Sequence, residues 1–153
     1  MKILYIITGL GVGGAERQVL DLAERFHRQG HEVKICYLTG SALLRPQSSD
    51  IELIALDFEK SISGVIGGLF KLRGLIKDFA PDVVHANMVH ANLVSRIIRP
   101  FCSIKKLVNT AHSTNEGGKV KMLAYRLTHS LADVTTNVTH EAVRVFEQKK
   151  ACP

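Results

Sequence analysis

Residues 1–26 read MKILYIITGLGVGGAERQVLDLAERF, and this stretch decides the fold of the chain. An apolar run typical of a buried strand leads into a glycine-rich turn, and a helical pattern follows directly. The turn contains Gly9, Gly11, Gly13 and Gly14, whose small size lets a ligand approach the backbone. Backbone N–H groups at a helix start have no partner inside the helix, and the helix dipole adds partial positive charge. The stretch therefore predicts an α/β protein with a pocket for a phosphate or another anion.

The spacing of these glycines matches the dinucleotide fingerprint G-x-G-x-x-G at Gly9, Gly11 and Gly14. That fingerprint also requires an acidic residue at the end of the second strand. Here the second apolar run ends in Leu-Thr-Gly, and the next acidic residue is Asp50, so the sequence argues against NAD or a flavin dinucleotide. A P-loop is excluded because Ala-Glu follows the glycines where Lys and Ser or Thr are needed. A tight turn without a ligand remains the alternative to an anion pocket.

The composition is that of one globular domain: 153 residues, of which 46% are hydrophobic and 22% charged. The net charge of +6 indicates an anionic partner, and nucleic acid, phospholipid and sugar nucleotides all qualify. No apolar run approaches the ~18 residues of a membrane span, and the N-terminus resembles a signal peptide only faintly, because Thr8 and glycines interrupt its apolar stretch. We therefore expect a cytoplasmic protein. The three cysteines are widely spaced without a C-x-x-C pair, which argues against a disulfide framework or a zinc site.

Apolar runs alternate with segments of helical periodicity along the whole chain, which predicts a Rossmann-like, doubly wound parallel sheet. The expected strands are 2–8, 32–38, 51–56, 82–86, 106–111 and 133–137. The expected helices are 14–29, 61–79, 89–100, 119–131 and 139–149. Residues 40–50 form a polar loop.

Ligands of such sheets bind beyond the carboxyl ends of the strands, so polar residues that follow the strands are the candidates for a site. They follow three of the expected strands. These candidates are His85, Asn87, His90 and Asn92 after the fourth strand, His112, Ser113, Thr114, Asn115 and Glu116 after the fifth, and Asn137, Thr139, His140 and Glu141 after the sixth.

Four segments carry a resemblance to a known family. They are GVGGAE (11–16), PDVVHAN (81–87), NTAHSTNEGG (109–118) and ADVTTNVTHEAV (132–143). In this order and spacing they resemble the N-terminal domain of the family 4 glycosyltransferases, enzymes of the GT-B fold, over essentially the whole chain. The resemblance implies transfer of a sugar, with retention at the anomeric carbon, from a nucleotide-diphosphate donor to a sugar or lipid-linked acceptor. The family builds its enzymes from two Rossmann-like domains, so residues 1–153 are expected to be the acceptor-side domain, without the donor-binding domain and inactive alone.

The resemblance also implies roles for individual residues. Gly13 and Gly14 match the loop that approaches the donor diphosphate and the acceptor, and Glu16 and Arg17 follow it. His112 matches the histidine near the donor sugar, where it stabilises a developing oxocarbenium ion. The acceptor cleft is expected to include His85, Asn87, His90, Ser113, Glu116 and Gly117.

Simpler interpretations compete with several of these roles. Glu16 complements the dipole of its own helix, Arg17 is a solvated surface side chain, and Thr139 caps the last helix. His85, His90 and His112 lack an acidic ligand at a compatible spacing, and we expect neither a metal nor another cofactor. Glu16 and Glu24 form an E-x7-E pattern, but the family places that signature in its second domain, so we interpret this one as accidental.

Basic residues gather in segments 71–77, 96–106 and 119–126. In the second, Arg96 and Arg99 flank the apolar Ile97, Ile98 and Phe101, a pattern that predicts peripheral contact with anionic lipid or an ordinary solvated helix face. Nucleic-acid binding is not expected, because no aromatic residues are interleaved with the charges. The alternatives to a transferase are a GT-B sugar-nucleotide enzyme such as an epimerase and a stand-alone module that binds anions or lipids.

Overall fold

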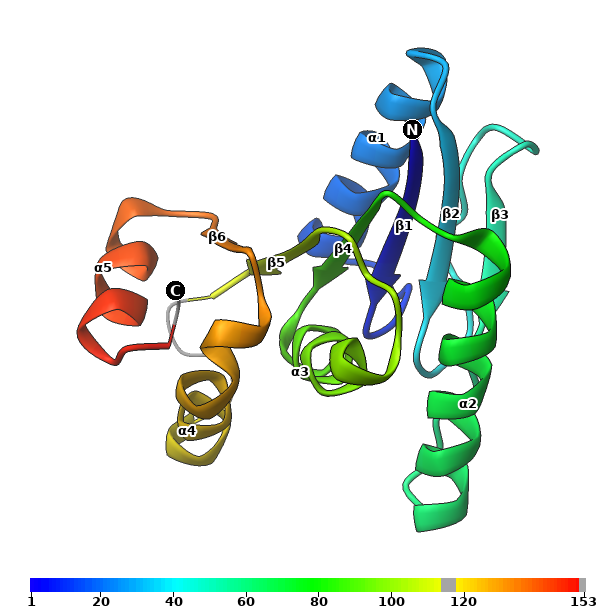
Figure 1. The fold of residues 1–153 in the computed structure, drawn as a ribbon. Helices are drawn as coiled ribbons and strands as arrows, with labels where there is room; N and C mark the ends of the chain where they lie inside the picture. The colour runs from blue at the N-terminus through cyan, green and yellow to red at the C-terminus, as the bar shows by residue number, and fades with distance from the viewer. Residues whose placement is uncertain (114–117, 152–153) are drawn as a thin grey trace.

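A computed structural model describes residues 1–113 and 118–151 of the chain. A six-stranded, all-parallel sheet with the strand order β3-β2-β1-β4-β5-β6 forms its centre (Figure 1). The doubly wound, Rossmann-like fold is therefore confirmed, and each strand boundary lies within one residue of its expected position. The strands are β1 (Lys2–Ile7), β2 (Glu32–Tyr37), β3 (Glu52–Ala55), β4 (Val83–Asn87), β5 (Leu107–Ala111) and β6 (Val134–Asn137).

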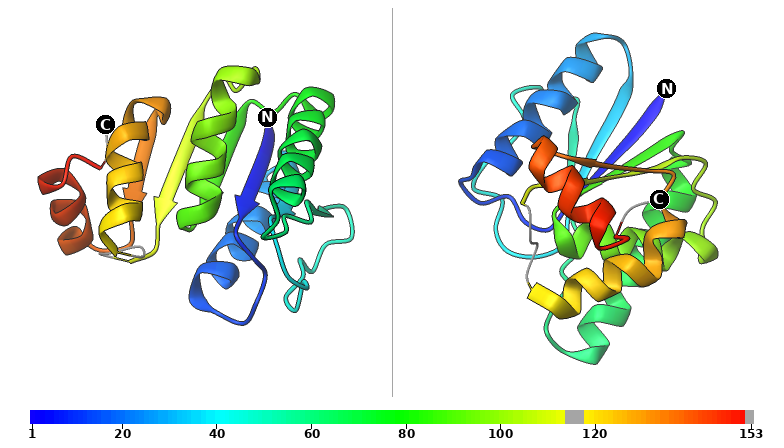
Figure 2. Two further views of the ribbon diagram at one scale, coloured as in Figure 1. Left: turned by 90° about the horizontal axis from the view of Figure 1, so that it is seen from below. Right: turned by 90° about the vertical axis from the view of Figure 1, so that its left-hand side faces the viewer.

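Helices cover both faces of the sheet, as the crossovers of parallel strands require. One face is packed by α1 and the other by α2, α3 and α4, while α5 packs against α4 beyond the β6 edge (Figure 2). The helices are α1 (Gly14–Arg28), α2 (Ile62–Phe79), α3 (Val89–Ile98), α4 (Gly118–Thr128) and α5 (His140–Gln148), with the 3-10 turns η1 (Arg99–Phe101) and η2 (His129–Leu131). None of the helices in the described part of the chain is long and apolar enough to cross a bilayer.

The apolar run of β1 is continuous because both of its faces are buried. Ile3, Tyr5 and Ile7 pack against the α1 side, and Leu4 and Ile6 pack against the α2 and α3 side. Side chains alternate between the faces of a strand, so a strand with a helix on each side needs apolar residues at every position.

The helix ends have local causes that are visible in the sequence. The Ser61 hydroxyl accepts from the Gly64 N–H at 3.0 Å and caps α2, and Thr139 accepts from the Ala142 N–H at 3.1 Å and caps α5. The expected capping role of Thr139 is thus confirmed. Gly30 follows the end of α1 with φ of 84°, a left-handed conformation that glycine adopts without strain.

The expectation that Arg96 belongs to a basic surface over 96–106 is wrong. Its side chain is fully buried between α3, α4 and the sheet. Its guanidinium donates to Asn109 Oδ1 at 2.5 Å, to the Tyr125 carbonyl at 3.2 Å and to Thr135 Oγ1 at 3.0 Å. It also lies 4.8 Å from the centre of the Tyr125 ring. Arg96 therefore joins α3, β5, α4 and β6, and it is unavailable to a membrane or another partner.

Replacing Arg96 by Met tests this assignment. The variant keeps the apolar stem but leaves several buried acceptors unsatisfied, so we expect the free energy of unfolding to fall by roughly 2–4 kcal/mol. Urea denaturation measures the change, and Arg126→Met on the exposed side of α4 is the matched control. Equal stability of the two variants would contradict the structural role of Arg96.

Candidate functional site

The glycine-rich loop joins β1 to α1 and leaves the first amides of the helix without intrahelical partners. Gly13 is the N-cap in an extended conformation, and its carbonyl accepts from the Arg17 N–H at 3.2 Å. Among the described residues, no side chain caps the N–H groups of Gly14, Ala15 and Glu16. Three amides and the positive end of a 15-residue helix thus lie at the mouth of the loop.

The four loop glycines serve to leave space rather than to adopt left-handed backbone angles. Among the described residues, the glycines with positive φ are Gly30, Gly40 and Gly118, outside this loop. A Cβ on Gly14 would meet no atom within 4 Å, so that position is open to a ligand. A Cβ on Gly13 would lie 2.5 Å from Glu16 Oε2, because the Glu16 carboxylate lies over the loop. The Glu16 carboxylate therefore covers part of the candidate anion pocket, with a charge of the same sign as the expected ligand.

Strand register brings this loop to the same edge as the polar segments after β4 and β5. Ile7 at the end of β1 pairs with Asn87, and Asn87 pairs with Thr110. Beyond the strands, the Ala91 N–H at the start of α3 donates to Thr8 Oγ1 at 3.3 Å. Two helix N-termini, those of α1 and α3, therefore lie at one edge of the sheet with the residues that follow β5 (Figure 1).

His112 and Asn87 form a pair at this edge. The distance from His112 Nε2 to Asn87 Oδ1 is 3.2 Å, and the Asn87 amide nitrogen donates to the His85 carbonyl at 3.2 Å. Because the Asn87 nitrogen is used in that bond, its oxygen faces His112, and Nε2 acts as the donor. In the neutral form of the ring, this tautomer has its lone pair on Nδ1.

His85 lies inside β4, two residues before the strand ends, and not after the strand as expected. Its Nε2 is 2.7 Å from Thr110 Oγ1, which in turn is 2.7 Å from Thr136 Oγ1, and its ring lies 5.2 Å from the Tyr5 ring. Burial, with a smaller contribution from His112, lowers the pKa of His85 to about 4. His85 is thus a neutral hydrogen-bonding residue within the sheet.

The lowered pKa predicts how stability depends on pH. Between about pH 4 and the ordinary histidine value near 6.5, the unfolded chain binds a proton at His85 and the folded chain does not, so stability falls as the pH drops through this window. In His85→Gln the fall between pH 6.5 and 4 should be smaller, as measured by urea unfolding at several pH values. An NMR titration in which His85 protonates near pH 6.5 would contradict this assignment.

The remaining candidates of the acceptor cleft differ in position. His90 is exposed in the first turn of α3, Ser113 is exposed after His112, and Arg17 is exposed in the first turn of α1. Thr114, Asn115, Glu116 and Gly117 lie outside the described residues. Asn92, which was expected at the rim, is instead fully buried and donates to the Thr110 carbonyl and to the Tyr125 hydroxyl.

Two features of the site were missed in the sequence. Met88, between Asn87 and α3, has φ of 73° and ψ of 157°, a conformation that is essentially restricted to glycine. Such strain is stored where the surrounding structure requires a particular backbone direction, and here it turns the chain from β4 into α3 beside the Asn87–His112 pair. Nothing in the sequence around Met88 signals this, because glycine is the usual marker of such a position.

The second missed feature is Glu24, which fixes the loop after β2. Its Oε1 accepts from the backbone N–H groups of Gln47 at 2.6 Å and Ser48 at 2.9 Å. Glu16 and Glu24 thus have separate local roles along α1, and the interpretation of their E-x7-E pattern as accidental stays a prediction. Within residues 1–113 and 118–151, no group of three His, Cys, Asp or Glu side chains is placed to hold a metal ion.

Comparison with known proteins identifies the family. The model of "Glycosyltransferase Family 4" matches residues 12–153. The chain belongs to glycosyltransferase family 4. A sequence comparison of this family 4 domain with curated proteins finds no match.

Solved structures agree with this family 4 domain in fold. The lipopolysaccharide outer core galactosyltransferase WaaB superposes with a TM-score of 0.75 at 15% identity, covering 97% of this chain and 42% of that one. HepE from Anabaena, solved with UDP and glucose, gives 0.74 at 19% identity over 97% and 41% of the two chains. UDP-GlcNAc 2-epimerase from Methanocaldococcus jannaschii gives 0.65 at 14% identity over 97% and 42%. The chain thus spans less than half the length of these proteins, and at these identities the similarity shows the GT-B half-fold alone.

Proposed function

We propose that this domain is the acceptor-side half of a retaining glycosyltransferase that moves a sugar from a nucleotide-diphosphate donor to a sugar or lipid-linked acceptor. The proposal depends mainly on one observation. The N-terminus of α1, whose first amides have no intrahelical partner, lies at the same edge of the sheet as the Asn87–His112 pair. Family membership supports glycosyl transfer in general. Retention and the type of acceptor are inferred from the resemblance to family 4 alone.

The amides of Gly14 and Ala15 are suited to the charge that builds on the leaving diphosphate. They point outward from the positive end of α1, and the space above Gly14 is open. Fixed donors of this kind stabilise a developing anion without reorganisation. In this proposal the leaving phosphate accepts the acceptor proton, so no protein carboxylate has to act as a base, in contrast to glycosidases with their pair of carboxylates. The proposal requires Glu16 to turn away when the donor binds, because its carboxylate lies beside Gly13.

His112 is suited to the positive charge that develops on the transferred sugar. Asn87 holds Nε2 as a donor, which keeps the lone pair of the neutral ring on Nδ1. A lone pair or a backbone carbonyl beside the anomeric carbon stabilises an oxocarbenium-like transition state. Asn87 is thus a positioning residue, and His112 is the proposed catalytic residue.

The proposal assigns the nucleotide to a second α/β domain. WaaB and HepE are more than twice as long as the region that this chain matches, and the HepE structure contains UDP and glucose. We expect residues 1–153 to show no turnover unless a donor-binding domain accompanies them. Turnover by these residues alone would contradict the assignment of donor binding to a second domain.

The transfer reaction tests the proposal directly. The protein with its donor-binding domain is incubated with UDP-, GDP- and ADP-sugars and a panel of neutral and lipid-linked acceptors, and the anomeric configuration of the product is read by NMR. We expect retention, and His112→Ala should lower kcat by about 10²–10³, as for loss of one stabilising group in a transition state. Arg144→Ala on exposed α5 is the control. An inverted product, or full activity of His112→Ala, would contradict the proposal.

An epimerase is the second candidate, because UDP-GlcNAc 2-epimerases share the fold. The same assay separates the two activities. Conversion of UDP-GlcNAc to its 2-epimer without an acceptor would establish the epimerase in place of the transferase.

We also propose that the expected membrane contact uses the outer side of α2 together with η1. The segment 96–106 cannot supply it as a unit, because Arg96 and Ile98 are buried and Arg99 pairs with Asp133 at 2.8 Å. Phe70 and Phe101 are instead 66% and 69% exposed. They line an apolar hollow of about 410 Å³ together with Ile66, Leu69, Ile97, Ile98 and the basic Arg73. An apolar surface with basic residues is typical of an interface with anionic lipid.

Vesicle binding tests this surface. The protein should cosediment with vesicles that contain phosphatidylglycerol and should bind less to phosphatidylcholine alone. The double variant Phe70→Ser/Phe101→Ser should lose most of the binding, since each ring contributes apolar area. Val120→Ser/Leu127→Ser, which removes exposed apolar side chains from α4, is the matched control. Equal loss in both variants would contradict the assignment to α2 and η1.

A further inference from the structure

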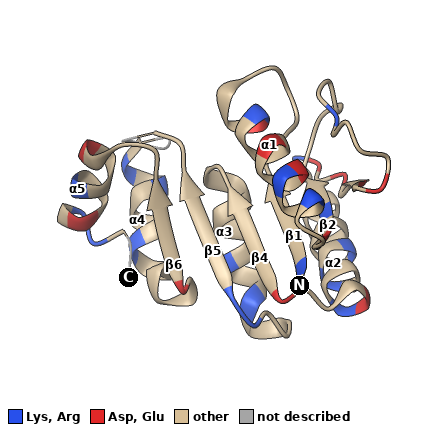
Figure 3. Cartoon of the chain, turned by 90° about the horizontal axis from the view of Figure 1, so that it is seen from above, with Lys and Arg blue, Asp and Glu red and all other residues tan. Residues whose placement is uncertain are grey.

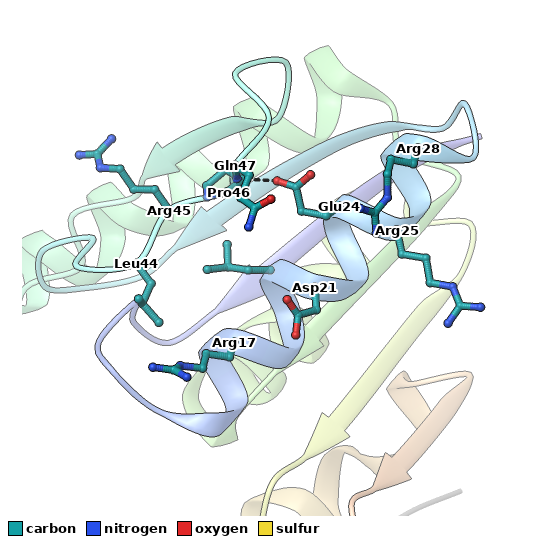
Figure 4. Close-up of a pocket in the computed structure, with 10 residues that line it drawn as sticks. Arg17, Asp21, Glu24, Arg25, Arg28, Leu44, Arg45, Pro46 and Gln47 are labelled. Atoms are coloured by element: carbon teal, nitrogen blue, oxygen red, sulfur yellow. Dashed lines mark hydrogen bonds between the residues drawn. The ribbon is translucent and has the colours of Figure 1, made fainter.

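A second site lies along the outer side of α1, where the helix and residues 44–47 enclose a hollow of about 540 Å³ (Figure 4). This volume is in the range of small-molecule sites. Its walls carry four arginines, Arg17, Arg25, Arg28 and Arg45, which Figure 4 shows at its two ends. Figure 3 shows that basic and acidic residues both occur along α1.

The four guanidinium groups are not used by the fold. Within residues 1–113 and 118–151, none of them forms an ion pair, whereas Arg99 elsewhere pairs with Asp133 at 2.8 Å. The hollow contains two carboxylates, Asp21 and Glu24, and Glu24 already accepts from two backbone N–H groups. The side chains that line the hollow thus have a net charge of +2. The N–H groups of the four guanidinium groups remain available to donate to the oxygens of an anion.

The arrangement of the charges defines the shape of the ligand. Arg17 and Arg28 are separated by eleven residues of helix, which is about 16 Å along the axis. One phosphate cannot contact both ends, so a ligand that binds the arginines at both ends has to be extended. Asp21 and Glu24 lie between the arginine-bearing ends, as Figure 4 shows. They repel a continuous anionic backbone, but they accept hydrogen bonds from hydroxyl groups.

We propose that this hollow binds an acidic oligosaccharide, with anionic groups at the arginines and neutral, hydroxyl-rich sugar between them. Leu20 and Pro46 supply apolar floor for the sugar rings. The hollow begins at Arg17, one helical turn from Gly13, so a glycan bound there extends toward the glycine loop. On the proposed transferase function, the ligand is the part of the acceptor away from the reacting hydroxyl, and the acceptor is therefore an acidic glycan.

Calorimetry with defined oligosaccharides tests the proposal without any requirement for activity. A hyaluronan tetrasaccharide, in which uronic acids alternate with neutral sugars, should bind at low salt and lose affinity as salt is added. Neutral chitotetraose should bind at least tenfold more weakly. Equal affinity for the two sugars, or no binding of either, would overturn the proposal. Tighter binding of an oligodeoxythymidylate would also overturn it, because the hollow would then accept a continuous phosphate backbone.

Substitutions of the arginines test whether the tetrasaccharide binds in this hollow. Arg25→Ala/Arg28→Ala should weaken binding of the hyaluronan tetrasaccharide by about tenfold or more, with an unchanged melting temperature, because both side chains are exposed. Arg126→Ala/Arg144→Ala changes the net charge equally on α4 and α5 and should have no effect. Equal weakening in the two double variants would show non-specific attraction and overturn the assignment. Since the glycine loop and His112 are untouched, failure of this test leaves the transfer assay as an independent measurement.

Discussion

Parallel pairing of β1, β4 and β5 is the constraint on which the rest of the structure depends. Parallel strands end at the same edge, and each must be followed by a helix that returns across a face of the sheet. The N-termini of α1 and α3 are therefore brought to that edge together, where the first amides of α1 have no intrahelical partner and the Ala91 N–H of α3 donates to Thr8 Oγ1. The candidate site is a direct consequence of this topology, and the side chains of Asn87 and His112 add chemistry to it.

A buried polar network supports the edge from beneath. Arg96 ties Asn109 of β5 and Thr135 of β6 to α4, and Asn92 ties the Thr110 carbonyl to Tyr125. Thr110 also contacts His85 through its hydroxyl. Buried polar groups are costly unless they are satisfied, so such a network favours one arrangement of α3, α4 and the last two strands. Because His112 directly follows β5, that arrangement also fixes the position of His112.

The sequence was a good guide wherever a single periodicity or a local motif determined the structure. The apolar runs located all six strands to within one residue, and Thr139 and Gly30 marked helix ends correctly. It was a poor guide where tertiary packing decides. Arg96 reads as a surface charge because the acceptors that bury it come from segments far along the chain. The roles of Glu24 and Met88 likewise depend on backbone groups and directions that have no residue-type signature.

The most direct test of the central claim is an NMR titration of the ¹⁵N-labelled protein with inorganic pyrophosphate, the group common to all nucleotide-diphosphate donors. If the start of α1 is an open anion site, the amide resonances of Gly14 and Ala15 shift and saturate together, and the shifts are larger in Glu16→Gln, which removes the carboxylate over the loop. If these amides do not respond at concentrations that shift other resonances, the glycine loop is only a turn, and the account of the site is wrong.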